Sequence, residues 1–269
     1  MSETKEYILG ADAKELFRLG VQHQIWAQEA QQGWHTAQFT EGQTLLDLGC
    51  GPGFCTKELA FLAGETGKVI GIDISQLYID HLKKVAKLQH LNIEAICSDF
   101  NEMQLATNSL DGMYCRWALA WLPNPKEILE KVYTALKPGA KMVIHEYYDW
   151  STHQTEPRKE HLAKAIDAAL QSFKDSPGSI DIGRELPRIL GELDMKVTTV
   201  RLMPKLGLPS NAVWQWPKTF YHSYFPRLVS MGYLSESEVS EALREMDELE
   251  HTPGASLLSP IMTEVIAEK

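Results

Sequence analysis

The chain has few cysteines, no long apolar run and no recognisable targeting segment. Its four cysteines, Cys50, Cys55, Cys97 and Cys115, form no Cys-x-x-Cys pair and no Cys/His zinc spacing. No stretch reaches the ~18 apolar residues of a membrane-spanning helix, and the polar residues 1–6 do not resemble a signal peptide. We therefore expect no disulfide, no metal ion, no membrane partner and a cytoplasmic location.

Positive charge is also scarce. The chain has 26 Lys and Arg residues against 36 Asp and Glu residues, which gives a formal net charge of -10. Proteins that bind nucleic acid usually present a basic patch, whereas here the basic residues are dispersed and residues 235–250 are acidic. We expect no nucleic-acid partner, and a small molecule as the substrate.

Glycine is concentrated at one informative place. Residues 45–48 are mostly apolar and include Asp47, and Gly49, Gly51 and Gly53 follow directly. This pattern predicts a buried strand, a tight turn and then a helix, with the turn open to a nucleoside-like ligand. A phosphate-binding P-loop is excluded because no Gly-Lys-Ser/Thr follows, and the third glycine of a dinucleotide fingerprint is replaced by Phe54.

Two further apolar runs end in acidic residues. Residues 69–72 lead to Asp73, which follows the glycine loop by the ~20 residues expected of a ribose-binding carboxylate. Such a carboxylate indicates ribose without indicating which cofactor carries it. Residues 93–97 lead to Asp99 and Phe100. Strands alternate with helical patterns through this region, so we predict an α/β fold.

The order of these motifs resembles the class I S-adenosylmethionine-dependent methyltransferases that act on small molecules. The resemblance lies in Leu-Asp-Leu-Gly-Cys-Gly-Pro-Gly at 46–53, the acid-ended strands, the Trp-Leu-Pro segment at 121–123 and Leu-Lys-Pro-Gly-Ala at 136–140. It implies a methyltransferase enzyme with S-adenosyl-L-methionine as cofactor and S-adenosyl-L-homocysteine as product. It also implies a three-layer, Rossmann-like fold with a seven-stranded, mostly parallel sheet, an antiparallel last strand and a helical lid.

The resemblance further implies cofactor contacts. Asp73 would bind the ribose, and Asp99 would bind the adenine amine beside Phe100, although Asp99 could instead cap the next turn. Asp47 would orient the cofactor's amino group or would simply be a solvated strand end. The predicted cofactor residues are Tyr7, Arg18, Gln22, Asp47, Gly49, Cys50, Gly51, Gly53, Asp73, Ile74, Ser98, Asp99, Phe100 and Arg116. The leader residues among them could equally form a solvated helix face.

We predict a single domain, residues 1–269, with five segments. They are a helical leader (1–40), a cofactor-binding core (41–150), helices and a strand that complete the sheet (151–202), a helical lid (203–257) and the final strand (258–269). Periodicity predicts helices at about 12–33, 126–136, 156–173 and 183–193, and strands at about 195–202 and 261–267. Ser235 and Glu238 match a capping box at the start of a lid helix.

The lid contains a cluster of aromatic residues that could be protein core or the wall of an acceptor pocket. The candidate acceptor residues are Trp117, Trp121, Asp149, Trp216 and Tyr221, with Trp150 beside them. His145 is the best-placed candidate for a general base, although a histidine in an apolar run is often structural. We expect methyl transfer to a small apolar or aromatic molecule by in-line displacement, for which alignment and exclusion of water can suffice without a base.

Three other interpretations stay open. A nicotinamide-linked oxidoreductase would need the missing third glycine. A protein of the same fold that binds S-adenosylmethionine without transferring methyl, either regulatory or a non-methylating natural-product enzyme, would keep the same motifs. A macromolecular acceptor would need an open groove in place of an enclosed lid. The acceptor atom and the oligomeric state cannot be deduced from these motifs.

Overall fold

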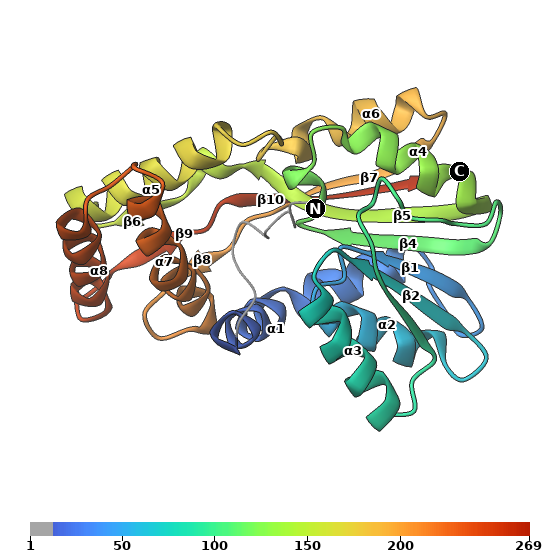
Figure 1. Ribbon diagram of the computed structural model, residues 1–269. Coiled ribbons are helices and arrows are strands. Elements are labelled where there is room, and N and C mark those ends of the chain that lie inside the picture. The colour runs from blue at the N-terminus through green and yellow to red at the C-terminus, as the bar shows by residue number, and fades with distance from the viewer. Residues whose placement is uncertain (1–12) are drawn as a thin grey trace, which may run out of the picture.

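The computed structural model describes residues 13–269 and is built on a seven-stranded sheet (Figure 1). Its strands are β1 (Thr44–Leu48), β2 (Lys68–Asp73), β3 (Ile93–Cys97), β4 (Leu110–Arg116), β5 (Leu136–Asp149), β7 (Lys196–Met203) and β10 (Ile261–Glu268). They lie in the order β3-β2-β1-β4-β5-β10-β7. The first five pair in parallel, whereas β10 is antiparallel to both β5 and β7. The predicted fold class and the antiparallel last strand are confirmed.

Helices cover both faces of this sheet. The helices are α1 (Ala13–Thr36), α2 (Phe54–Ala63) and α3 (Gln76–Leu88) on one face, and α4 (Pro125–Ala135) and α6 (Leu186–Glu192) on the other. Successive residues of β1 point to opposite faces. Leu45 packs with Trp34 and Leu59 from α1 and α2, whereas Leu46 packs in the cluster that contains Val132 and Ile189. The sheet is therefore buried on both faces, as its near-continuous apolar strands predict.

A group of helices and short strands, which we name the lid, lies beyond the end of the sheet at which β5 finishes (Figure 1). It consists of α5 (Glu160–Lys174), α7 (Ala212–Ser230), α8 (Glu236–Glu250) and a small sheet of β6 (Gln154–Glu156), β9 (Ser256–Leu258) and β8 (Leu206–Gly207). We expected α5 to complete the sheet layer, but it packs against α7 and α8 instead. The predicted capping box is present: Ser235 Oγ accepts the backbone N–H of Glu238, and Glu238 Oε2 accepts that of Ser235.

Several predicted helix ends shift for identifiable reasons. α1 continues through Gly20, where an added Cβ would lie 3.2 Å from the ring of Phe54, so glycine lets α1 approach α2. The helix expected from residue 156 begins at 160 because the preceding residues pair in β6. Single 3-10 turns form η1 (Leu119–Trp121), η2 (Trp150–Thr152) and η3 (Ile182–Arg184). Among residues 13–269 no helix has the length and apolar character needed to cross a membrane.

Candidate active site

The loop between β1 and α2 turns tightly because its three glycines have positive φ angles. At Gly49, with φ +75°, an added Cβ would lie 2.4 Å from Ala118 Cβ, so only glycine lets the backbone pass. At Gly51, with φ +53°, an added Cβ would meet no atom within 4 Å, so the loop opens there onto free space. Gly53 faces the other way, where an added Cβ would lie 2.3 Å from Leu82, and it therefore serves packing.

Asp73 ends β2 and reaches back to this loop. Its Oδ2 accepts the backbone N–H of Gly51 at 2.9 Å, and its Oδ1 accepts the backbone N–H of Ser75 at 2.8 Å. Burial raises the pKa of the Asp73 carboxyl above its ordinary value, against the opposing effect of these N–H groups. Each carboxyl oxygen can accept a second hydrogen bond, so Asp73 can still bind hydroxyl groups of a ligand.

A cavity of about 500 Å³ lies over the carboxyl ends of β1 to β4, which is the edge where open α/β sheets bind ligands. Its volume lies in the usual range of small-molecule sites. Most of the predicted cofactor residues line it: Gln22, Asp47, Gly49, Cys50, Gly51, Asp73, Ile74, Ser98, Asp99, Phe100 and Arg116. Gly53 and Arg18 do not line it, and Tyr7 lies outside the described residues.

Sequence reasoning missed other residues of this wall, notably Tyr78 and Tyr114. Tyr114 could have been found, because it lies two residues before Arg116 on the same strand, and side chains two apart share one face. Tyr78 lies on α3, and its distance from the loop in sequence gives no comparable signal.

Arg116 ends β4 and places a permanent positive charge in the cavity wall. Its Nη2 lies 3.3 Å from His23 Nδ1, and its Nη1 is buried with no hydrogen-bond partner among the described residues. Asp47 is buried nearby and accepts the hydroxyl of Thr56 at 2.6 Å. Burial raises the pKa of Asp47 to about 6, although the charge of Arg116 opposes this rise. A buried guanidinium N–H without a partner favours an anionic group in the cavity.

Asp99 and Phe100 follow β3 in the cavity wall. Asp99 Oδ1 accepts the backbone N–H and the side-chain amide of Asn101, both at 2.9 Å, so the predicted capping contact exists. Asp99 nevertheless lines the cavity, and the Phe100 ring lies close to the glycine loop. The capping role and a ligand role are therefore compatible for Asp99.

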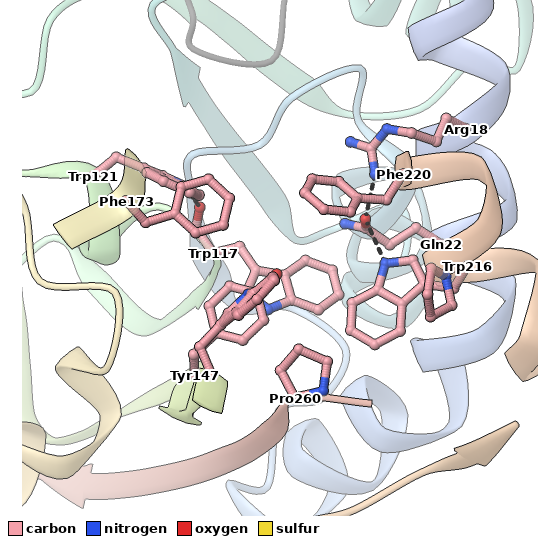
Figure 2. A pocket seen from close by; sticks show the side chains of 11 residues that line it. Arg18, Gln22, Trp117, Trp121, Tyr147, Phe173, Trp216, Phe220 and Pro260 are labelled. Atoms are coloured by element: carbon pink, nitrogen blue, oxygen red, sulfur yellow. Dashed lines mark hydrogen bonds between the residues drawn. The ribbon is translucent and has the colours of Figure 1, made fainter. Parts of the chain in front are cut away.

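A second, smaller cavity of about 50 Å³ adjoins the first, and Figure 2 shows the side chains that line this second cavity. The two cavities share Gln22, Trp117 and Trp121 in their walls. The side chains that line the second cavity come from α1, α5, α7 and the segments that follow β4, end β5 and precede β10. They are Arg18, Gln22, Trp117, Trp121, Tyr147, Trp150, Phe173, Trp216, Pro217, Phe220 and Pro260. Three predicted acceptor residues, Trp117, Trp121 and Trp216, thus lie in one wall together with Trp150.

Aromatic rings form most of this second wall. Trp117 stacks on Trp216 with 5.7 Å between ring centroids and on Tyr147 with 6.1 Å (Figure 2). Trp121 and Phe173 meet edge to face at 5.4 Å. These contacts fix the rings against one another and give the small cavity a mainly aromatic lining.

The structure does not place His145 in either cavity, contrary to its candidate role as a base. The side chain is fully buried on β5, where Nε2 lies 2.9 Å from Glu264 Oε2 and Nδ1 lies 3.3 Å from the Tyr114 hydroxyl. Burial lowers the pKa of His145 despite the opposing effect of Glu264. Because β10 inserts beside β5 and supplies Glu264, this histidine has a structural partner that lies far along the chain.

Asp149 and Tyr221 also lie outside the second cavity. Asp149 ends β5, where it accepts the backbone N–H of Ser151 at 3.0 Å and forms an ion pair with Arg184. Tyr221 is fully buried in the lid, where its hydroxyl lies 2.5 Å from His153 Nε2. These two acceptor-pocket predictions are therefore corrected: Asp149 caps a turn, and Tyr221 belongs to the lid core. No group of His, Cys, Asp or Glu side chains suited to a metal ion occurs within residues 13–269.

Comparison with known proteins now identifies the family. The methyltransferase domain family matches residues 39–191, which include β1 to α6, and the chain belongs to this family. It is similar to the demethylmenaquinone methyltransferase of Oceanobacillus iheyensis, with 35% identity over 106 residues, 39% of this chain and 44% of that protein. The chain spans about half or less of the length of the curated relatives it matches.

Solved structures share the fold over most of the chain. A protein of Bacillus halodurans C-125 described as a methyltransferase has a TM-score of 0.61 and 13% identity, covering 90% of this chain and 99% of that one. Geranyl diphosphate C-methyltransferase of Streptomyces coelicolor A3(2), solved with S-adenosyl-L-homocysteine, has a TM-score of 0.56 and 13% identity, covering 97% and 86%. The chain thus has the class I methyltransferase fold, whose cofactor is S-adenosylmethionine.

The first cavity fits this cofactor. The open side of Gly51 leaves room for a ligand against the backbone, and the Asp73 carboxyl at the strand end suits ribose hydroxyls. The unpartnered Nη1 of Arg116 suits a carboxylate, which the methionine part of the cofactor carries. The predicted cofactor, S-adenosylmethionine, is therefore confirmed at the level of the family and agrees with the chemistry of the cavity.

Proposed function

We propose that this protein transfers the methyl group of S-adenosylmethionine to a compact apolar or aromatic acceptor. The observation that supports this most directly is the junction of the two cavities, which share Gln22, Trp117 and Trp121. A ligand in the aromatic cavity would lie directly beside a cofactor in the larger one. Two of the helices that line the acceptor side, α1 and α7, fall outside the family match at 39–191, whereas Trp117, Trp121 and Phe173 lie inside it.

The backbone of residues 49–51 would lie against the nucleoside and methionine parts of the cofactor. Asp73 would accept hydrogen bonds from the ribose hydroxyls, since its carboxyl is fixed by the N–H groups of Gly51 and Ser75. Asp99 would accept the adenine amine, and the ring of Phe100 would pack near the base. Ile74 and Ser98 line the same stretch of wall.

Arg116 and Asp47 would hold the amino-acid end of the cofactor. The Arg116 Nη1, which has no partner among the described residues, would donate to the carboxylate of the methionine part. Asp47 lies in the same wall and would interact with the cofactor's amino group through the loop. Because a buried donor without a partner is unfavourable, a hydrogen bond from this guanidinium to the cofactor would make the free energy of binding more favourable.

When bound, the cofactor supplies a methyl carbon on a positively charged sulfur, which is a good leaving group. The chain's part is to align the acceptor and exclude water, and the stacked rings of Trp117, Trp216 and Tyr147 suit that task. Among the described residues, the polar side chains of the aromatic cavity are Arg18, Gln22 and Tyr147. The proposed mechanism therefore relies on proximity and on exclusion of water.

Calorimetry with S-adenosylmethionine and S-adenosylhomocysteine, run beside NAD and NADH, tests the cofactor part. We expect micromolar binding of the two sulfur nucleosides and a loss of about 10- to 100-fold in Asp73→Asn, because a charged hydrogen-bond acceptor is lost. Asp149→Asn is the matched control, since Asp149 also ends a strand but lies in neither cavity. Preference for NAD, or equal effects of the two substitutions, would contradict the assignment.

A mass-shift screen of small aromatic and apolar molecules then tests transfer. The expected result is an acceptor that gains one methyl group while S-adenosylhomocysteine accumulates in equal amount. If the cofactor binds but acceptors are converted without gaining a methyl group, the chain is a non-methylating enzyme of the same fold. If the cofactor binds and no molecule is converted, a regulatory protein becomes the better interpretation.

A further inference from the structure

The side-chain amide of Gln22 has a fixed orientation. Its Oε1 accepts a hydrogen bond from Arg18 Nη1 at 2.9 Å and another from Trp216 Nε1 at 2.9 Å (Figure 2). A guanidinium and an indole nitrogen can only donate, so the amide oxygen must face them and the amide nitrogen must face away. Reversing the amide would put its N–H groups against two donors, which the geometry forbids.

The fixed amide stands at the junction of the two cavities. Gln22 lines both the large cavity and the aromatic one, and Figure 2 shows both hydrogen bonds ending on its oxygen and none on its nitrogen. Trp216 comes from α7 in the lid, whereas Gln22 and Arg18 come from α1. One of the two hydrogen bonds that orient the amide therefore comes from the lid, and the other comes from α1 itself.

The remaining polar groups of the aromatic cavity are also mainly donors. Arg18 donates through Nε and Nη2 to the two carboxylate oxygens of Glu15, at 2.7 and 2.6 Å, and a guanidinium group can donate hydrogen bonds but cannot accept them. Tyr147 is the exception, since a hydroxyl can donate or accept. No carboxylate is among the described residues that line this cavity. A ligand with a hydrogen-bond acceptor is thus complementary to the wall, and a ligand with an ammonium group is not.

We propose that Gln22 is a specificity-determining residue whose Nε2 N–H donates to an oxygen of the methyl acceptor. This inference rests on the proposed function. The acceptor class is then a compact aromatic molecule with a carbonyl, carboxylate or phenolic oxygen directed at the junction. Amines of the same size are rejected, because an ammonium group would place its own N–H groups against this donor. Trp216 is a positioning residue, since it holds the Gln22 oxygen away from the ligand.

Benzoate and benzylamine are suitable probes, because they have similar size and opposite hydrogen-bonding groups. Their binding is followed by tryptophan fluorescence in the protein saturated with S-adenosylhomocysteine, whose own affinity is measured separately by calorimetry. We expect wild-type protein to bind benzoate about tenfold or more tightly than benzylamine. Gln22→Glu keeps the shape of the side chain and an oxygen for Arg18 and Trp216, but replaces the donor by an acceptor. It should reverse the preference between the two probes when the protein is saturated with S-adenosylhomocysteine.

Two further variants make the test specific. Trp216→Phe keeps an aromatic ring but removes one of the two donors that orient the amide, so it should reduce the preference for benzoate. Gln28→Glu introduces the same change on the exposed side of α1 and should leave both probes unaffected. The proposal would be overturned if neither probe binds, if wild type prefers benzylamine, or if the preference survives in Gln22→Glu.

The cofactor measurement separates this proposal from the proposed function. If Gln22→Glu weakens S-adenosylhomocysteine about tenfold and leaves the probe preference unchanged, the amide donates to the cofactor and the specificity role is wrong. If wild-type protein fails to bind S-adenosylhomocysteine at all, the proposed function itself fails, and the specificity role fails with it.

Discussion

Glu146 offers a direct test of the energetics of the site, because it is a fully buried carboxyl beneath the segment that separates the two cavities. Its Oε1 accepts the backbone N–H of Leu119 at 2.8 Å, and its Oε2 is buried with no hydrogen-bond partner among the described residues. The segment it supports includes Trp117, which has a positive φ of 57° and lines both cavities. Burial raises the pKa of Glu146 from 4.5 to about 8, against the opposing backbone N–H groups of residues 118–120.

A raised pKa makes stability depend on pH with a definite sign. In the folded protein Glu146 keeps its proton up to about pH 8, whereas the unfolded chain releases it at about pH 4.5. The contribution of this group to the free energy of unfolding is therefore fully present below about pH 4.5 and is lost as the pH rises toward 8. From the two pKa values, the loss between about pH 5 and about pH 8 is on the order of 3 kcal/mol.

The perturbation is Glu146→Gln, which keeps an oxygen for the Leu119 N–H but cannot ionise. Urea denaturation of wild type and variant at about pH 5, 6, 7 and 8 gives the free energy of unfolding at each pH. We expect the difference between the two proteins to shift by about 3 kcal/mol in favour of the variant from the lowest to the highest pH. Other titrating groups, Asp47 among them, contribute to both proteins and cancel in this difference.

Glu102→Gln, at an exposed position, is the control for the substitution itself. Parallel pH profiles for wild type and Glu146→Gln would refute the reasoning, because they would mean that Glu146 titrates alike in the folded and unfolded chain. A difference of the opposite sign would mean that the N–H groups of residues 118–120 outweigh burial, so that the folded protein holds the carboxylate in its charged form.

Two further predictions concern residues on either side of the site. Gly51→Ala should weaken S-adenosylhomocysteine by about tenfold or more in calorimetry, because it adds a methyl group at the open side of the loop at positive φ. Gly139→Ala introduces the same type of strain at φ +80° away from the cavities and should not change that affinity, so equal effects would contradict the argument. His145→Gln should lower the free energy of unfolding by about 2 kcal/mol, because it disturbs the buried contact with Glu264. Turnover of an acceptor found in the mass-shift screen should stay within about threefold, and a large loss of turnover without loss of stability would restore His145 as a base.

Most of the predicted cofactor residues line the larger cavity, because the information that places them is local in the sequence. One loop and two acid-ended strands supply Gly49, Gly51, Asp73 and Asp99, and in a parallel sheet the carboxyl ends of neighbouring strands meet at one edge. Each of these residues could be placed from its own strand alone. The strand order that brings these ends together is seen only in the folded chain.

The acceptor side could be predicted only in part, because periodicity does not tell which face of an aromatic helix meets a cavity. On α7 the apolar residues surround the helix: Trp216 and Phe220, four residues apart, face the cavity, whereas Tyr221 turns into the lid core. Their spacing of four was a usable signal for Phe220. Similarly, the surroundings of His145 depend on Glu264, which β10 brings beside β5 only in the folded chain.

The cofactor cavity and the acceptor cavity therefore differ in how much of their walls lies inside the family match, and so in which substitutions can alter one wall without the other. The residues from 47 to 116 that we propose to bind the cofactor lie inside the family match, whereas Gln22 and Trp216 lie outside it, on α1 and α7. Substitutions in α7 can alter the acceptor wall without touching the glycine loop or Asp73. The exception is the hydrogen bond from Trp216 to Gln22, because Gln22 borders both cavities. If that bond orients the amide, a substitution in the lid changes acceptor binding through Gln22 on α1. The effect of Trp216→Phe on the preference between benzoate and benzylamine should then disappear in a protein that already carries Gln22→Glu.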